Sequence, residues 1–325
     1  MQSRVLTLAN LRRIITVKLK HSLLRPTLDV VFKMLFARRR GRSALISLLN
    51  EILKPKSKIT SVEVLNPDIP KILVGDKGTV LDIHARLADG TLLDIEMQMS
   101  SHDALAKRAL YYGSRMYSSE LKKGHFYSEL RPVIVIFLVA EDISPSRPSD
   151  FEVSFSLQQD DTGAAVFAEL REQMQIKFFE ISKAFRLWQE RQLPADDVSL
   201  GAWLGFLADP SSRAVEEACM SIPGLKDAKN ALEELSAQDE AREIARVREK
   251  SRIHFDSLMA EATAKGEAKG KAEGEAKGKA EGRDEKAKSV LVALLSAPET
   301  ESLPDARLAE LTGLSVEVVA TFRKR

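Results

Sequence analysis

Two short runs of the sequence carry oxygen-bearing side chains at a spacing that suits a divalent cation. In residues 81–87 and 93–99, apolar and polar residues alternate strictly. An alternation with a period of two is typical of β-strands that have one buried face. The polar positions include Asp82, Glu96 and Gln98. Because Mg²⁺ and Mn²⁺ prefer oxygen ligands, Asp82 and Glu96 are candidate metal ligands, with Gln98 beside them.

The turn between the two runs determines how they pair. Its Asp-Gly dipeptide is a strong hairpin signal. A two-residue turn would oppose apolar to polar residues, whereas a three-residue loop at 88–90, with its glycine at positive φ, keeps the apolar faces together. In this register Ile83 opposes Ile95 and Asp82 opposes Glu96, with Cβ atoms about 5 Å apart. Two opposed carboxylates destabilise a hairpin unless a cation neutralises them.

The alternative to a metal site is an ordinary solvated strand face, because polar outer faces are common on antiparallel sheets. His84 lies on the same face, two residues after Asp82. We expect this histidine to be a neighbour of the site rather than a ligand.

Basic residues are concentrated at the start of the chain. The first 60 residues hold 14 Lys and Arg against two acids, whereas the net charge of the whole chain is only +2. Such a local excess attracts polyanions, and we expect Arg38, Arg39 and Arg40 to bind phosphate groups of DNA. A solvated helix face or tail is the alternative interpretation. Residues 1–24 contain no acid and fit either an organelle-targeting presequence or an extension upstream of the functional start, which we favour.

The composition of the chain limits the classes of protein to which it could belong. The single cysteine, Cys219, excludes a disulfide framework and a thiolate metal cluster. A single cysteine fits the reducing cytosol, so we expect a cytoplasmic protein, and no apolar run is long enough to span a membrane. Alternating helical and β patterns predict an α/β fold with a mixed sheet flanked by helices. Strands are expected over 132–140, 151–157 and 175–180, and helices from Thr27, over 43–53, and from a cap at Ser101 to about residue 121.

The C-terminal part of the chain is repetitive and then helical. Five glycines recur at every fourth position from 266 to 282, among Ala, Lys and Glu. In a helix these glycines would cost about 4–5 kcal/mol, so we favour a linker over residues 261–288. As a helix, the repeat would present small residues that allow close approach of a second copy, and a homo-oligomer through this region is the alternative. Residues 289–325 are expected to form a small helical domain.

Three segments of the sequence, in this order, resemble the Rpn family of recombination-promoting nucleases, within the PD-(D/E)XK nuclease superfamily. These segments are PTLDVVFKMLF, LDIHARLADGTLLDIEMQ and KRALYYGSRMYSSELKKGHFYSELRPVIVIFLV. The resemblance covers roughly residues 25–206 and implies a restriction-endonuclease-like core that cleaves DNA with Mg²⁺, in recombination, transposition or phage defence. We expect the nuclease domain, with a helical distal part, to extend over residues 25–260. The resemblance does not cover the basic extension 1–24, although the repeat and the C-terminal tail are also habitual in the family.

The resemblance also assigns roles to individual residues. Asp82 matches the metal-binding aspartate of the superfamily, Glu96 the carboxylate of its E-x-K motif, and Gln98 the position of its lysine. Glutamine orients water by hydrogen bonding but lacks the positive charge of lysine. The remaining matches are Asp29 on the first helix and the R-x-x-x-Y pair Arg108 and Tyr112, and Lys33 is a further candidate phosphate contact.

Each of these weaker candidates has a structural alternative. Asp29 would favour a helix N-terminus, Arg108 would pair with Asp103 or Glu120, and Tyr112 would belong to the core. For the whole chain, the alternative function is a non-catalytic DNA-binding or regulatory protein that self-associates through its C-terminal region.

Overall fold

The computed structural model describes residues 22–67, 82–99, 104–121, 124, 126–159 and 167–324. The chain divides into two compact units, Met1–Ser251 and Arg252–Arg325. Most of the basic extension predicted at residues 1–24, and the predicted helix cap at Ser101, lie outside the described residues. None of the described helices has the length and the apolar character needed to cross a membrane.

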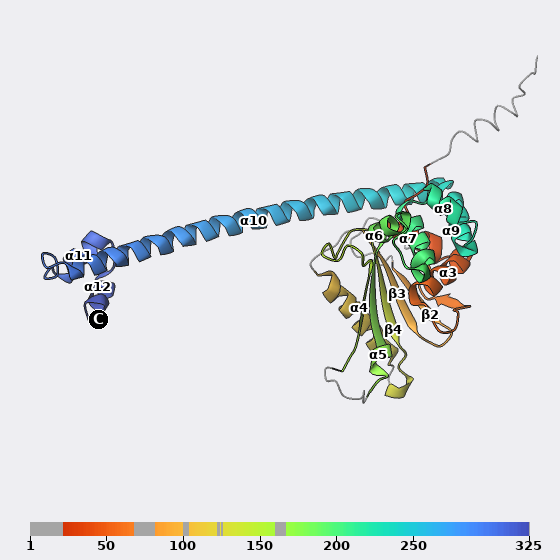
Figure 1. Ribbon diagram of the computed structural model, residues 1–325, viewed down its shortest axis with the longest axis horizontal. Helices are drawn as coiled ribbons and strands as arrows, with labels where there is room; N and C mark the ends of the chain where they lie inside the picture. Colours follow the sequence, from red (N-terminus) through yellow and green to blue (C-terminus); the bar gives the residue numbers. More distant parts are fainter. Residues whose placement is uncertain are drawn as a thin grey trace, which may run out of the picture. The chain divides into compact units, whose positions relative to one another are not determined.

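A six-stranded mixed sheet forms the centre of the first unit (Figure 1). Its strands are β1 (Val62–Val64), β2 (Ile83–Leu87), β3 (Leu92–Gln98), β4 (Val133–Val139), β5 (Glu152–Ser156) and β6 (Met174–Glu180), in the order β1-β2-β3-β4-β6-β5. Strands β3, β4 and β6 are parallel to one another, while β1, β2 and β5 pair antiparallel. The three strands predicted after the hairpin are therefore confirmed.

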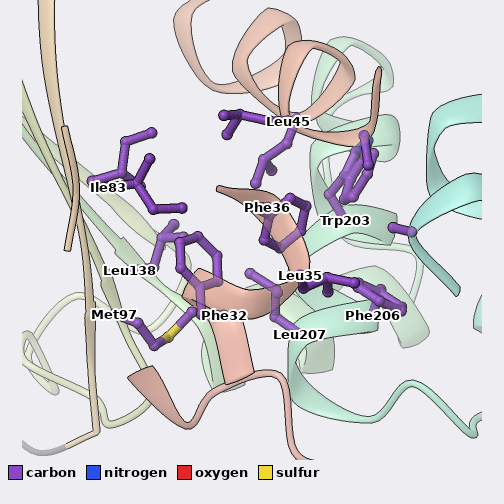
Figure 2. Close-up of a cluster of buried hydrophobic side chains, with 14 of the residues drawn as sticks. Phe32, Leu35, Phe36, Leu45, Ile83, Met97, Leu138, Trp203, Phe206 and Leu207 are labelled. Carbon is purple, nitrogen blue, oxygen red and sulfur yellow. The ribbon is translucent and has the colours of Figure 1, made fainter. Parts of the chain in front are cut away.

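Helices cover both faces of this sheet, as the sequence predicted. They are α2 (Asp29–Phe36), α3 (Arg42–Leu53), α4 (Leu105–Glu120), α5 (Leu170–Gln173), α6 (Ile181–Gln189), α7 (Val198–Ala208), α8 (Arg213–Ala218) and α9 (Pro223–Ser236), with 3₁₀ turns η1 (Arg39–Gly41), η2 (Tyr127–Glu129) and η3 (Ala195–Asp197). On one face, Phe32 and Phe36 of α2 pack with Trp203 of α7 and with Met97 of β3, as Figure 2 shows. On the other face, α4 covers β4 through Ala109.

The β2–β3 hairpin has the predicted register. Ile83 pairs with Ile95, and the loop is the expected one of three residues, with the Leu87 amide donating to the Thr91 carbonyl at 2.9 Å. Gly90 has a φ of +90°, a conformation that favours glycine. The odd-numbered residues of both strands therefore face the larger core, and the polar residues of the hairpin lie on the face that α4 covers.

A buried ion pair closes the junction between β6 and α6. The Lys183 ammonium lies 2.9 Å from the Glu180 carboxylate, and the two side chains are 1% and 0% exposed. The ammonium also donates to the carbonyls of Ser144 and Arg147, and Glu180 accepts from the amide of Ile143 at 2.9 Å. This network ties the loop after β4 to the ends of two parallel strands.

We predict that Lys183→Met destabilises the first unit by about 3–5 kcal/mol, because it leaves the Glu180 carboxylate buried without its cation. Adding Glu180→Gln should recover much of this loss. Both tryptophans, Trp188 and Trp203, belong to the first unit, so urea unfolding followed by their fluorescence measures this unit. The control is Arg213→Met, at an exposed ion pair, which should change the free energy of unfolding by less than about 0.5 kcal/mol. An equally small effect of Lys183→Met would contradict the prediction.

The glycine repeat is helical, which is the alternative that the sequence left open beside the linker that we favoured. It lies within α10 (Asp239–Ser296), and the second unit also contains α11 (Asp305–Thr312) and α12 (Val316–Arg323). The alanines between the glycines have the highest helix propensity, and ion pairs at i and i+4 offset a part of the cost of glycine; Lys265, for example, pairs with Glu261 at 2.7 Å. After the repeat, Leu291, Leu308 and Val319 form a small core, which gives residues 289–325 the expected helical structure.

We predict that replacing all five glycines, at 266, 270, 274, 278 and 282, by alanine stabilises this helix by about 4–5 kcal/mol in total. A Cβ atom added at any of them would meet nothing within 4 Å, so no clash offsets the gain. The temperature at which the far-ultraviolet helical signal is lost should rise. A matched variant with the repeat's five alanines replaced by glycine should lower it, and no shift in either direction would contradict a helical repeat.

Candidate metal site

Three polar side chains of the hairpin converge on the face of the sheet next to α4. The His84 Nε2 atom lies 2.6 Å from Oδ2 of Asp82 and 3.3 Å from Oδ1 of Asp94. One ligand atom from each of these residues lies within 4.8 Å of the other two. The register explains the arrangement, because His84 is directly opposite Asp94 and Asp82 immediately precedes β2. The three residues can therefore hold one cation between them.

Burial opposes ionisation of the two carboxylates in this cluster. The Asp94 side chain is only 2% exposed, and burial raises its pKa. Burial also opposes ionisation of Asp82, but its ion pair with His84 lowers the pKa of Asp82. The close approach of Asp82, and to a lesser degree of Asp94, raises the pKa of His84 to about 10. At neutral pH the imidazolium is thus the cation that holds the two carboxylates together, and a bound metal ion would take its place.

Among the described residues, one oxygen of this cluster is poorly satisfied. Asp94 Oδ1 is buried and accepts no hydrogen bond within the described part of the chain, although the imidazole of His84 lies 3.3 Å away. A buried carboxylate oxygen in this state loses its solvation without full compensation. A divalent cation bound next to Asp94 Oδ1 would compensate for this lost solvation. The available donors, two carboxylates and an imidazole, suit such a cation.

Glu96 lies beside this cluster and is paired with a different cation. Arg108 Nη2 on α4 donates to Oε2 of Glu96 at 2.8 Å and to Oε1 of Gln98 at 2.5 Å. The guanidinium also lies over the rings of Tyr112 and Phe137, with its Cζ atom 5.9 and 5.5 Å from the two centroids. Burial raises the pKa of Glu96 to about 7; the charge of Arg108 counteracts part of this rise, whereas the charges of Asp94 and Asp82 add to it.

The structure therefore brings five of the predicted residues into one neighbourhood: Asp82, Glu96, Gln98, Arg108 and Tyr112. It adds Asp94 and His84, which we had not selected as ligands. The sequence could have indicated both residues, because the register that opposes Ile83 to Ile95 also opposes His84 to Asp94. Arg108 pairs with Glu96 rather than with the neighbouring acid Glu120, which binds Arg86 of β2.

The two candidates on the first helix lie in other surroundings. The Asp29 carboxylate is held by Arg248 of α10 through Nη2 at 2.5 Å and Nε at 3.0 Å. Lys33 is 2% exposed within α2, so its ammonium is not at the surface. A catalytic role for Asp29 and a phosphate contact for Lys33 stay predictions.

The arginine cluster Arg38, Arg39 and Arg40 is exposed at η1. It lines an open groove of about 670 Å³ whose opposite wall, on α9, contains Asp227 and Glu234. Arg40 pairs with Glu234 at 3.3 Å, and both side chains are largely exposed. The cluster is accessible to a polyanion, and its binding to DNA stays a prediction.

Comparison with known proteins identifies the family to which this arrangement corresponds. Residues 26–262 match the family described as PD-(D/E)XK nuclease family transposase. Comparisons with curated proteins and with solved structures gave no match. The mixed sheet flanked by helices agrees with the restriction-endonuclease-like core that the sequence predicted.

We predict that Mn²⁺ binds to this cluster and that Asp82→Asn and Asp94→Asn each weaken binding at least about tenfold, because each removes a carboxylate ligand. Isothermal titration calorimetry with Mn²⁺ measures the dissociation constants. The control is Glu217→Gln, an exposed acid on α8, which should leave the affinity unchanged.

The same titration distinguishes two ligand sets. If His84 is a ligand, His84→Ala weakens Mn²⁺ binding and Glu96→Gln has little effect. If Glu96 is a ligand, the opposite holds. An affinity that neither aspartate variant changes would contradict a metal site at this cluster.

Proposed function

This chain belongs to the PD-(D/E)XK nuclease family transposases, and we propose that it is a metal-dependent DNA endonuclease that hydrolyses phosphodiester bonds at the Asp82–Asp94–Glu96 cluster. The observation that carries the proposal is the convergence of Asp82, His84 and Asp94 on one hairpin, where Asp94 Oδ1 has no hydrogen bond within the described part of the chain. Glu96 lies close enough for the charges of Asp94 and Asp82 to raise its pKa. Mg²⁺ suits the carboxylate oxygens, and Mn²⁺ also accepts the imidazole of His84.

Asp82 and Asp94, with either His84 or Glu96 as the third ligand, would hold the metal, which supplies an activated water and polarises the scissile phosphate when bound. The side chains around them position the reacting groups. Gln98 lies at the end of β3 and orients the attacking water through its amide. Arg108 keeps Glu96 in place and presents its positive charge toward the phosphate, where negative charge develops during cleavage.

Arg108 also compensates for the absence of a lysine at position 98. A lysine there would contribute a positive charge next to the attacking water. In this chain the Gln98 amide oxygen accepts a hydrogen bond from Arg108 at 2.5 Å, so the guanidinium brings a cation to the same place from α4. Glutamine and arginine together thus provide the orientation and the charge that lysine alone would provide.

Binding of DNA would depend on the basic residues at the start of the chain. Arg38, Arg39 and Arg40 are exposed and would contact the phosphate backbone without regard to sequence. Affinity that comes from such contacts falls steeply with salt. We propose that the cleavage serves recombination, transposition or defence against foreign DNA.

We predict that the chain nicks plasmid DNA in the presence of Mg²⁺ or Mn²⁺ and that EDTA abolishes the reaction. Asp82→Ala, Asp94→Ala and Glu96→Ala should each lower the rate by roughly two to three orders of magnitude, because metal ligation contributes several kcal/mol to the barrier. Conversion of supercoiled plasmid to the open circle measures the rate, and Glu217→Gln is the control.

Two results would reject the proposal. One is cleavage by Asp82→Ala and Glu96→Ala at the parent's rate. The other is salt-dependent DNA binding by the parent protein with no metal-dependent cleavage, which would favour the non-catalytic DNA-binding alternative.

A further inference from the structure

Helix α4 carries a stripe of basic and aromatic side chains on its solvent side. Lys107, Tyr111 and Arg115 follow one another at intervals of four residues, so they lie along one side of the helix. All three are exposed, and Tyr111 is 60% exposed although its ring is large. No ion pair of Lys107 or Arg115 occurs within the described part of the chain. The described residues of α4 contain no acid before Glu120, which binds Arg86.

This stripe borders the candidate metal site. Arg115 follows Arg108 by seven residues, just under two helical turns, so the two arginines lie on nearly the same line along α4. Arg108 reaches from that line to Glu96. Tyr111 lies between the two arginines along the helix, slightly further toward solvent. A ligand along the stripe would therefore run beside the carboxylates.

A row of planar groups connects the core to the exposed end of this surface. The Arg108 guanidinium lies over the rings of Phe137 and Tyr112, and the centroids of Tyr112 and Tyr111 are 6.0 Å apart. Phe137 is fully buried, whereas Tyr111 is exposed. Tyr111 thus ends the row with a ring that contacts Tyr112 and remains accessible to a further planar group.

We propose that α4 binds a strand of the nucleic acid substrate, with Tyr111 stacking on an unpaired base and with Lys107 and Arg115 contacting phosphates on either side. The two cations are eight residues apart, about 12 Å along the helix. The preferred substrate is consequently DNA with unpaired bases near the cleaved bond, such as a single strand, a flap or a frayed end. The inference rests on the proposed nuclease function for its biological meaning, but strand binding is measured separately from cleavage.

Charge distinguishes this proposal from a protein interface. Leu110 is also exposed, at 54%, but it lies about 100° around the helix from Tyr111. The cations flank Tyr111 along its stripe, and they complement a phosphate chain rather than an apolar partner. Leu110 is therefore the matched control on the same helix.

The test measures binding of a fluorescently labelled single-stranded oligonucleotide and of the corresponding blunt duplex, by fluorescence anisotropy of the full chain in EDTA. We expect the parent to prefer the single strand. Tyr111→Ala should weaken single-strand binding roughly 5- to 100-fold, while Tyr111→Phe preserves it. Arg115→Ala and Lys107→Ala should each reduce the slope of log affinity against log salt by about one. Leu110→Ala should change neither quantity.

The outcomes separate this inference from the nuclease proposal. If Tyr111→Ala and Leu110→Ala bind both oligonucleotides as the parent does, the stacking surface is wrong, even if the parent cuts DNA. A loss of binding in Leu110→Ala as large as in Tyr111→Ala would indicate an apolar protein interface and would also overturn it. If the parent binds single strands through Tyr111 but cuts no DNA with Mg²⁺ or Mn²⁺, the nuclease proposal fails and the binding surface stands. Circular dichroism of each variant confirms that the chain remains folded.

Discussion

The site depends on the register of the β2–β3 hairpin. A shift of one residue in one strand would turn the side chains of that strand to the opposite face: in β2 it would place Ile83 in solvent and His84 in the core, and in β3 it would do the same to Ile95 and Asp94. The three-residue loop with Gly90 at positive φ enforces the observed pairing, and the apolar face, packed against α2 and α7, stabilises it. Since the same pairing opposes His84 to Asp94, the packing of the core and the assembly of the acidic cluster are consequences of one constraint.

The register of the hairpin places several carboxylates close together in a buried position, where ionisation is unfavourable. Asp94 and Glu96 are both mostly buried and both have raised pKa values. Two internal cations make the arrangement tolerable: His84 between Asp82 and Asp94, and Arg108 against Glu96. The cations differ in permanence. Arginine stays charged at any physiological pH, whereas histidine can give up its proton when a metal binds. The two carboxylates thus have an internal cation between them, and the proposed metal ion would replace it.

The local pattern of apolar and polar residues predicted the strands of the sheet better than it predicted the contacts of the site residues. Strict alternation gave the hairpin and its register, and the β-branched run at 133–139 gave the buried parallel strand β4. The interaction of Asp29 with Arg248 could not be predicted, because the partners are 219 residues apart and only the tertiary fold joins them. The buried Lys183–Glu180 pair has the same origin, since its stability depends on carbonyls from the loop after β4. For the glycine repeat, helix propensity alone favoured a linker over the helical alternative, whereas in the structure the intervening alanines and the i,i+4 ion pairs accompany a continuous helix.

Arg108 of α4 lies between the acidic residues of the candidate metal site and the exposed stripe of Lys107, Tyr111 and Arg115. Both hydrogen bonds that this arginine makes to Glu96 and Gln98 come from Nη2, and the rings of Tyr112 and Phe137 hold the guanidinium plane. The Nε atom of the same guanidinium is buried and makes no hydrogen bond within the described part of the chain. The charge of Arg108 therefore lies beside the carboxylates, where a bound phosphate would be placed by the proposed function. Because Tyr112 also contacts Tyr111, a base stacked on Tyr111 would press on the same row of planar groups that positions Arg108. Under the two proposals, strand binding on α4 and the charge beside the cleaved bond would thus depend on one series of contacts, from Tyr111 through Tyr112 to Arg108.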